Sequence, residues 1–147
     1  MAGIDVRSVL LARHAQHVVF VHFPIGLFLA GVFFDGVAWK TSRQDFATAA
    51  YFNLVAAAMS VPLVVATGIL AWQWQLEGQK LRGVLLLHFV LACVVGVLIC
   101  VLGIVRYRAR NLPLRSPSLL ISEAGVALAL AVTAHLGGVL SGVNIPG

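Results

Sequence analysis

Residues 84–105 read VLLLHFVLACVVGVLICVLGIV, and this stretch decides the fold class. It is 22 residues long and contains no Asp, Glu, Lys or Arg. A helix of about 20 apolar residues crosses the hydrocarbon core of a bilayer, which is roughly 30 Å thick. The stretch lacks the strict alternation of apolar and polar residues that marks a half-buried strand. It therefore predicts a membrane-spanning helix.

The rest of the chain is also strongly apolar. Of its 147 residues, 61% are hydrophobic and 10% are charged, whereas a soluble domain carries about 25% charged residues. A water-exposed globular protein is therefore excluded. Three further apolar runs predict spans at 17–39, 47–72 and 118–141. We expect an all-α, up-and-down bundle of four transmembrane helices forming one domain over 17–143, preceded by an interfacial segment at 1–16.

Local signals indicate where the helices begin. Pro24 lies inside the first span, removes one backbone hydrogen bond and predicts a kink. A helix that began at Pro24 would rise only about 24 Å over 16 residues, so we expect it to begin earlier. Ser42 with Asp45 resembles a capping box that opens the second helix. Ser116 and Pro117 suit the N-cap and first position of the fourth.

The basic residues predict an orientation. The first and third loops hold Lys40, Arg43, Arg106, Arg108, Arg110 and Arg115. The N-terminal segment and the second loop hold Arg7, Arg13, Lys80 and Arg82. Because cytoplasmic loops carry the excess of Lys and Arg, six against four places the termini outside the cytoplasm. These residues stand singly between apolar runs, which is not the pattern of a nucleic-acid-binding protein.

Three histidines fall at one predicted depth. His22 lies about five residues into the first span, His88 about four into the third, and His135 about six from the end of the fourth. In an up-and-down bundle all three lie some 6–9 Å below the same membrane surface. Ionisable residues are rare within a bilayer and usually face the bundle interior with a partner. The three imidazoles are therefore candidates for a shared site.

Haem b is the cofactor that this pattern favours. Two histidines ligate its iron, and apolar side chains pack against the ring. The first and third spans are diagonal in the bundle, so we expect His22 and His88 to be the axial pair, with His135 as a substitute. Gly68 on the second span supplies space near the same level. His17 points about 140° away from His22 around the helix, so we do not expect the two to share one ligand position. His17 is a secondary candidate for cofactor binding, with any role near the surface.

The function expected is electron transfer between a quinol or another membrane partner and a periplasmic carrier, without substrate chemistry of its own. Two alternatives stay open. One is a copper- or zinc-handling membrane protein, since imidazole suits both metals, although the chain has no Met- or Cys-rich path. The other is a structural or assembly subunit in which the histidines only form hydrogen bonds. Cys93 and Cys100 are two turns apart, too far for a disulfide, and are expected to be small buried hydrophobes.

The remaining charged residues have simple expected roles. Asp35 is near the end of the first span, and we expect it to pair with Arg43 or to reach the membrane surface. Glu123 opens the fourth span, where a carboxylate suits a helix N-terminus. Arg106 is expected to be a topological anchor.

Four blocks of sequence resemble a known family. The blocks are HVVFVHFPIGLFLAGVFFD (17–35), AAYFNLVAAAMSVPLVVATGILAW (49–72), LRGVLLLHF (81–89) and AHLGGVLSGV (134–143). Together they resemble domain-of-unknown-function family 2231, whose members are four-helix predicted membrane proteins of bacteria. The HFP and HLGG blocks are the most specific parts. The family often continues after the two glycines with a polar aromatic residue and a further His, and this chain has neither.

The resemblance implies an electron-transfer setting in the bacterial inner membrane. Family members occur fused to, or beside, Rieske iron–sulfur and c-type cytochrome modules, so the resemblance implies a partner of that kind. Its characteristic histidines correspond to His17, His22, His88 and His135 of this chain.

Overall fold

The computed structural model describes residues 13–75, 77–78, 80–109 and 116–142, which form four helices and no strand. The helices are α2 (Arg13–Thr41), α3 (Gln44–Gln75), α4 (Gly83–Arg108) and α5 (Pro117–Leu140). The all-α prediction is confirmed. Each helix contains one of the four predicted spans, except that 118–141 runs one residue past the end of α5. Of the interfacial segment expected at 1–16, residues 1–12 lie outside the described part of the chain.

All four helices are long and apolar enough to cross a membrane, with candidate spans of 24 to 31 residues. Twenty-four helical residues rise about 36 Å, more than a hydrocarbon core of roughly 30 Å. The outer surface is apolar, and Met59, Ile121 and Leu128 are each at least 70% exposed. Trp39 and Trp74 lie near opposite ends of the bundle, where indole rings favour the membrane interface. The protein is therefore a multi-pass membrane protein whose outer face suits lipid.

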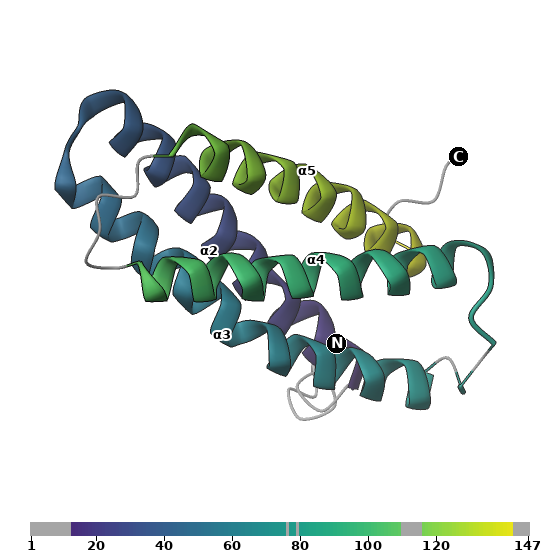
Figure 1. Cartoon of the computed structure of the whole chain (residues 1–147). Helices are drawn as coiled ribbons and strands as arrows, with labels where there is room; N and C mark the ends of the chain where they lie inside the picture. Colours follow the sequence, from purple (N-terminus) through teal and green to yellow (C-terminus); the bar gives the residue numbers. More distant parts are fainter. Residues whose placement is uncertain (1–12, 76, 79, 110–115, 143–147) are drawn as a thin grey trace, which may run out of the picture.

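The helices form a ring in chain order (Figure 1). Each packs against its neighbours in sequence, and α5 returns to α2, so α2 and α4 lie across the ring from each other. α2 and α4 end, and α3 and α5 begin, at one end of the bundle, which we call the triad end. The starts of α2 and α4 and the ends of α3 and α5 lie at the other end, which we call the histidine end. Chemistry-bearing residues occur at both ends.

Small residues set the closest approaches between the helices. The core contains Phe28 from α2, Leu54 from α3 and Ile99 from α4, each at most 2% exposed. A Cβ atom built on Gly31 would lie 2.7 Å from Leu54 Cγ, and one built on Gly103 would overlap the Ala58 methyl group. Such contacts are typical of membrane bundles, where close backbone packing replaces the hydrophobic effect as the force between helices.

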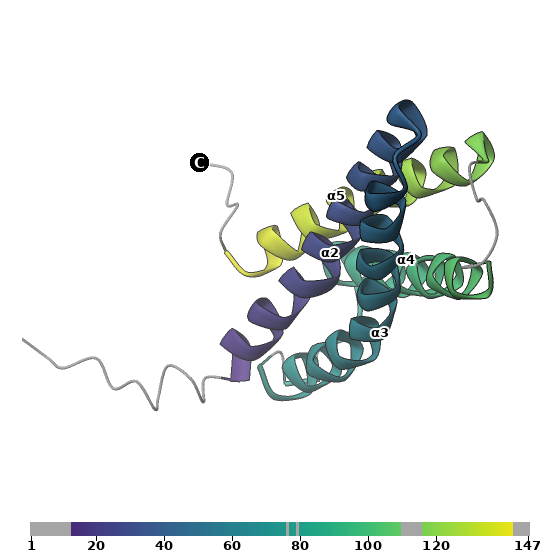
Figure 2. The same cartoon turned by 90° about the vertical axis from the view of Figure 1, so that its left-hand side faces the viewer.

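The helix ends agree only in part with the sequence signals. Ser116 is the N-cap of α5 and Pro117 follows at its first position, as predicted. The reciprocal bond of the capping box expected at Ser42 is wrong, because the Ser42 N–H donates to the Ala38 carbonyl rather than to Asp45, and Ser42 has φ 58°. Ser42 therefore ends α2 in a left-handed conformation. Both α2 and α3 continue through an internal proline, and Figure 2 shows α3 curving along its length.

The contact at Gly103 gives a stability prediction. Gly103→Ala should destabilise the protein by about 1–3 kcal/mol, because the new methyl group forces α3 and α4 apart. Gly125→Ala is the matched control, since a Cβ there meets nothing within 4 Å, and better helix propensity should leave stability equal or higher by about 0.5–1 kcal/mol. The measurement is thermal unfolding in a mild detergent, followed by circular dichroism. Equal melting temperatures would contradict the packing described.

Candidate functional site

His88 lies on α4 at the histidine end and contacts α5. Its Nδ1 is 3.1 Å from the carbonyl oxygen of Thr133. A carbonyl only accepts hydrogen bonds, so the proton of a neutral imidazole is on Nδ1 and the lone pair is on Nε2. A Cβ atom on Gly137 would lie 3.1 Å from His88 Cε1. The ring therefore rests where α5 has no side chain.

His17 lies on α2 and makes the corresponding contact with α3. Its Nδ1 is 3.2 Å from the hydroxyl oxygen of Thr67. That hydroxyl has one hydrogen and lies within 3.1 Å of the Leu63 and Val64 carbonyls in its own helix. Since the hydroxyl donates to a carbonyl, it accepts from His17, which places the imidazole proton on Nδ1. A Cβ atom on Gly68 would lie 3.1 Å from His17 Cε1, as at His88.

His22 and His135 have different surroundings. His22 is exposed, and its Nδ1 is 2.5 Å from the Val18 carbonyl of its own helix. His135 is also exposed. Because α2 begins at Arg13, His22 lies about 14 Å along its helix, whereas His17, His88 and His135 lie about 6–8 Å from the nearer end of theirs. Measured along the helices, His17 therefore lies closer than His22 to the level of His88 and His135.

The described residues place His17 beside Gly68 and His88 beside Gly137. Within the described ranges, no three His, Cys, Asp or Glu side chains are grouped as a metal ion would need. A zinc site uses three or four protein ligands. Axial ligation of a haem iron uses only two histidines, so the absence of a three-ligand group among the described residues does not bear on a haem site.

A buried ion triad lies at the other end of the bundle. Arg106 on α4 donates from Nη2 to Asp35 on α2, and from Nε and Nη2 to Oε1 of Glu123 on α5 at 3.0 and 2.7 Å. The side chains of Asp35, Arg106 and Glu123 are 11%, 6% and 0% exposed. One guanidinium thus joins three helices.

The triad corrects three expectations from the sequence. Asp35 pairs with Arg106, and the expected partner Arg43 instead bonds Asp45 at 2.5 Å on the exposed surface. Glu123 lies in the second turn of α5 and is fully buried against Arg106, so it does not serve the helix terminus. Arg106 is 5% exposed and is an internal ion-pair partner. The available signal was that charges inside apolar spans tend to pair with one another.

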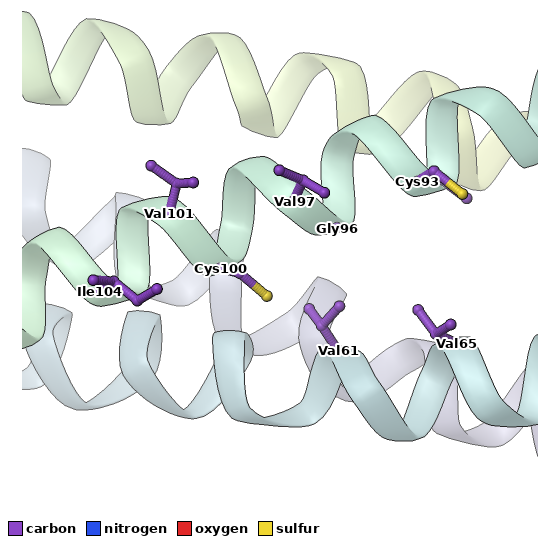
Figure 3. A pocket seen from close by; sticks show the side chains of 9 residues that line it. Val61, Val65, Cys93, Gly96, Val97, Cys100, Val101 and Ile104 are labelled. Atoms are coloured by element: carbon purple, nitrogen blue, oxygen red, sulfur yellow. The ribbon is translucent and has the colours of Figure 1, made fainter.

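The cysteines line a shallow groove between α3 and α4 (Figure 3). Both are free thiols, which confirms that they form no disulfide. Cys93 is exposed, so the expected burial was wrong for it, and Cys100 is half-buried with Sγ 3.9 Å from the Ala58 carbonyl. The other lining residues are Val61, Val65, Ala92, Gly96, Val97, Val101 and Ile104. This lining offers no charged group, and in a bilayer it faces acyl chains.

Comparison with known families agrees with this architecture. A family model described as "Predicted membrane protein (DUF2231)" matches residues 13–143. The chain belongs to this family. The match covers all four helices, the four histidines discussed above and the triad. No curated protein and no solved structure matches the chain.

The triad gives a second stability prediction for this DUF2231 member. Arg106→Ala should destabilise it by about 3–5 kcal/mol, because two buried carboxyl groups lose the cation that bonds both of them. Arg43→Ala is the control, since both partners in its ion pair are more than 60% exposed and the pair should contribute nothing measurable. Thermal unfolding in detergent would compare the two variants.

A second variant separates loss of charge balance from loss of packing. Asp35→Asn, Glu123→Gln and Arg106→Gln combined remove every charge of the triad. Asn and Gln keep the shapes of the two carboxyl side chains, whereas Gln is shorter than Arg, so both this variant and Arg106→Ala lose the guanidinium contacts. The triple variant should unfold at a higher temperature than Arg106→Ala, because it leaves no carboxyl group without its cation. If the two variants melt together, unbalanced charge does not account for the loss of stability in Arg106→Ala.

Proposed function

We propose that the protein is a b-type cytochrome subunit that binds one haem b at the histidine end and transfers electrons within the membrane. The observation that carries the proposal is the shared arrangement of His17 and His88. Each imidazole comes from one of two diagonal helices, is fixed through Nδ1 by an oxygen of the next helix, and rests against a glycine.

The donor chemistry fits an iron ligand. A metal-ligating histidine nearly always donates its other ring N–H to a carbonyl, carboxylate or water, which fixes the tautomer and the ring orientation. The Nδ1–H groups of His17 and His88 do so here, which leaves the lone pair of each neutral ring on Nε2. Haem b needs two such ligands and apolar packing around the ring. The arrangement favours haem over copper or zinc, because no grouping of three donors occurs among the described residues.

His88 is the proposed ligand from α4. For α2 the geometry favours His17, which lies at the level of His88 and is anchored to a second helix, whereas the pattern of spans alone favoured His22. His135 is exposed on α5 and is not needed for this pair. When bound, haem would supply reversible one-electron chemistry. The chain's own residues would hold and orient it: Thr67 and Thr133 aim the imidazoles, and Gly68 and Gly137 leave room for them.

The setting proposed is a redox complex in the bacterial inner membrane. The triad end carries the larger share of Lys and Arg, so it would face the cytoplasm and the histidine end the periplasm. A haem at that level could pass electrons from a quinol or another membrane partner to a Rieske iron–sulfur or c-type cytochrome protein. With four helices and short connections, the chain would act as a subunit within lipid rather than as a separate enzyme.

The test is the visible spectrum of the full-length protein, purified in detergent after expression with adequate haem supply. We expect a Soret band and, after reduction, an α-band. His17→Ala and His88→Ala should each abolish both bands, because one axial ligand is lost. His135→Ala is the matched control and should retain haem, as should His22→Ala.

Other outcomes would change the assigned ligand pair or overturn the haem proposal. Loss of haem from His22→Ala but not from His17→Ala would restore the pair expected from the sequence. Absence of any Soret band in the unmodified protein would overturn the proposal. Elemental analysis would then distinguish the alternatives: stoichiometric copper or zinc would indicate a metal-handling protein, and no metal a structural or assembly subunit.

A further inference from the structure

The ion triad contains one more carboxyl group than it can neutralise. Arg106 supplies one positive charge, and Asp35 and Glu123 would supply two negative charges if both were ionised. Arg43, just before α3, and Asp45 in its first turn form an ion pair of their own on the exposed surface. Among the described residues, no further charged side chain from α2, α3, α4 or α5 is recorded against Glu123. The fully ionised triad would therefore carry a net charge of −1 inside the bundle.

One oxygen of the triad has no hydrogen-bond partner in the described structure. Arg106 directs both Nε and Nη2 to Oε1 of Glu123, and Oε2 is buried without a partner. An ionised carboxylate oxygen that is buried from bulk solvent and accepts no hydrogen bond from the described residues is strongly destabilised. Buried groups in this situation neutralise instead. Glu123 is also the less exposed carboxyl group, at 0% against 11% for Asp35.

We propose that Glu123 is a proton-binding site and that the resting triad consists of an Asp35 carboxylate, the Arg106 guanidinium and a neutral Glu123 carboxylic acid. A proton from a hydronium ion of the bulk water forms an O–H bond at Oε2, and the net charge of the triad changes from −1 to zero. The bond that breaks is one O–H bond of the hydronium ion, which becomes water, and no electron is transferred. The site lies at the opposite end of the bundle from the imidazoles and does not depend on haem binding.

Infrared spectroscopy can detect the protonated carboxyl group of the triad. The full-length protein in detergent at neutral pH should show the C=O stretching band of a buried carboxylic acid, shifted downward in heavy water. Glu123→Gln should remove this band, because the proton-bearing group is gone. Asp35→Asn should also remove it, because Arg106 then has a single carboxylate to neutralise and Glu123 ionises. Arg106→Gln should increase it about twofold, because both carboxyl groups then hold protons.

Two controls test whether the band arises from Glu123 rather than from another carboxyl group. Asp45→Asn removes an exposed carboxylate and should leave the band unchanged. Haem propionates, if present, would give a band that does not respond to Glu123→Gln, so the result does not depend on the proposed cytochrome function. Absence of the band from the unmodified protein would overturn the proposal, even if a variant fails to fold. Retention of the full band in Glu123→Gln, or in a folded Asp35→Asn protein, would also overturn it.

Discussion

The arrangement of this bundle depends on the cost of placing a charge in hydrocarbon. Arg106 is buried between the helices, so it must find its partners within the fold. It does so by bonding Asp35 on α2, across the ring, and Glu123 on α5 beside it. These directed bonds complement the apolar contacts between helices, which are weakly specific when the solvent is itself apolar. The triad thus contributes to fixing which helices meet at this end of the bundle.

The spans were predictable because hydropathy and length report directly on the membrane. The run from Val84 to Val105 requires a helix by itself, and the structure places it in α4. Helix ends were less predictable, since they depend on local backbone geometry. Ser42 and Asp45 have capping-box spacing, but the chain already turns at Ser42 with a positive φ.

The sequence indicated many of the residues that form the candidate sites, but it did not indicate which residues contact one another there. The histidines stood out as polar residues within apolar spans, but their spacing does not reveal that His17 and His88 contact Thr67 and Thr133. Asp35 was expected to pair with Arg43 or to reach the membrane surface. Its partner, Arg106, is 71 residues away and belongs to a diagonal helix. Such a pairing follows from the ring order of the helices, which local patterns do not report.

The two imidazole anchors differ in one respect that bears on how this protein can vary. His17 is held by the hydroxyl group of Thr67, so the anchor exists only while residue 67 carries a side chain that accepts a hydrogen bond. His88 is held by the main-chain oxygen at position 133, which every amino acid possesses. A single substitution at residue 67 can therefore remove the first anchor. The second depends on the main-chain position of α5 and not on a particular side chain. Substitution of the Thr133 side chain would leave the carbonyl that holds His88 in place as long as α5 keeps the same course.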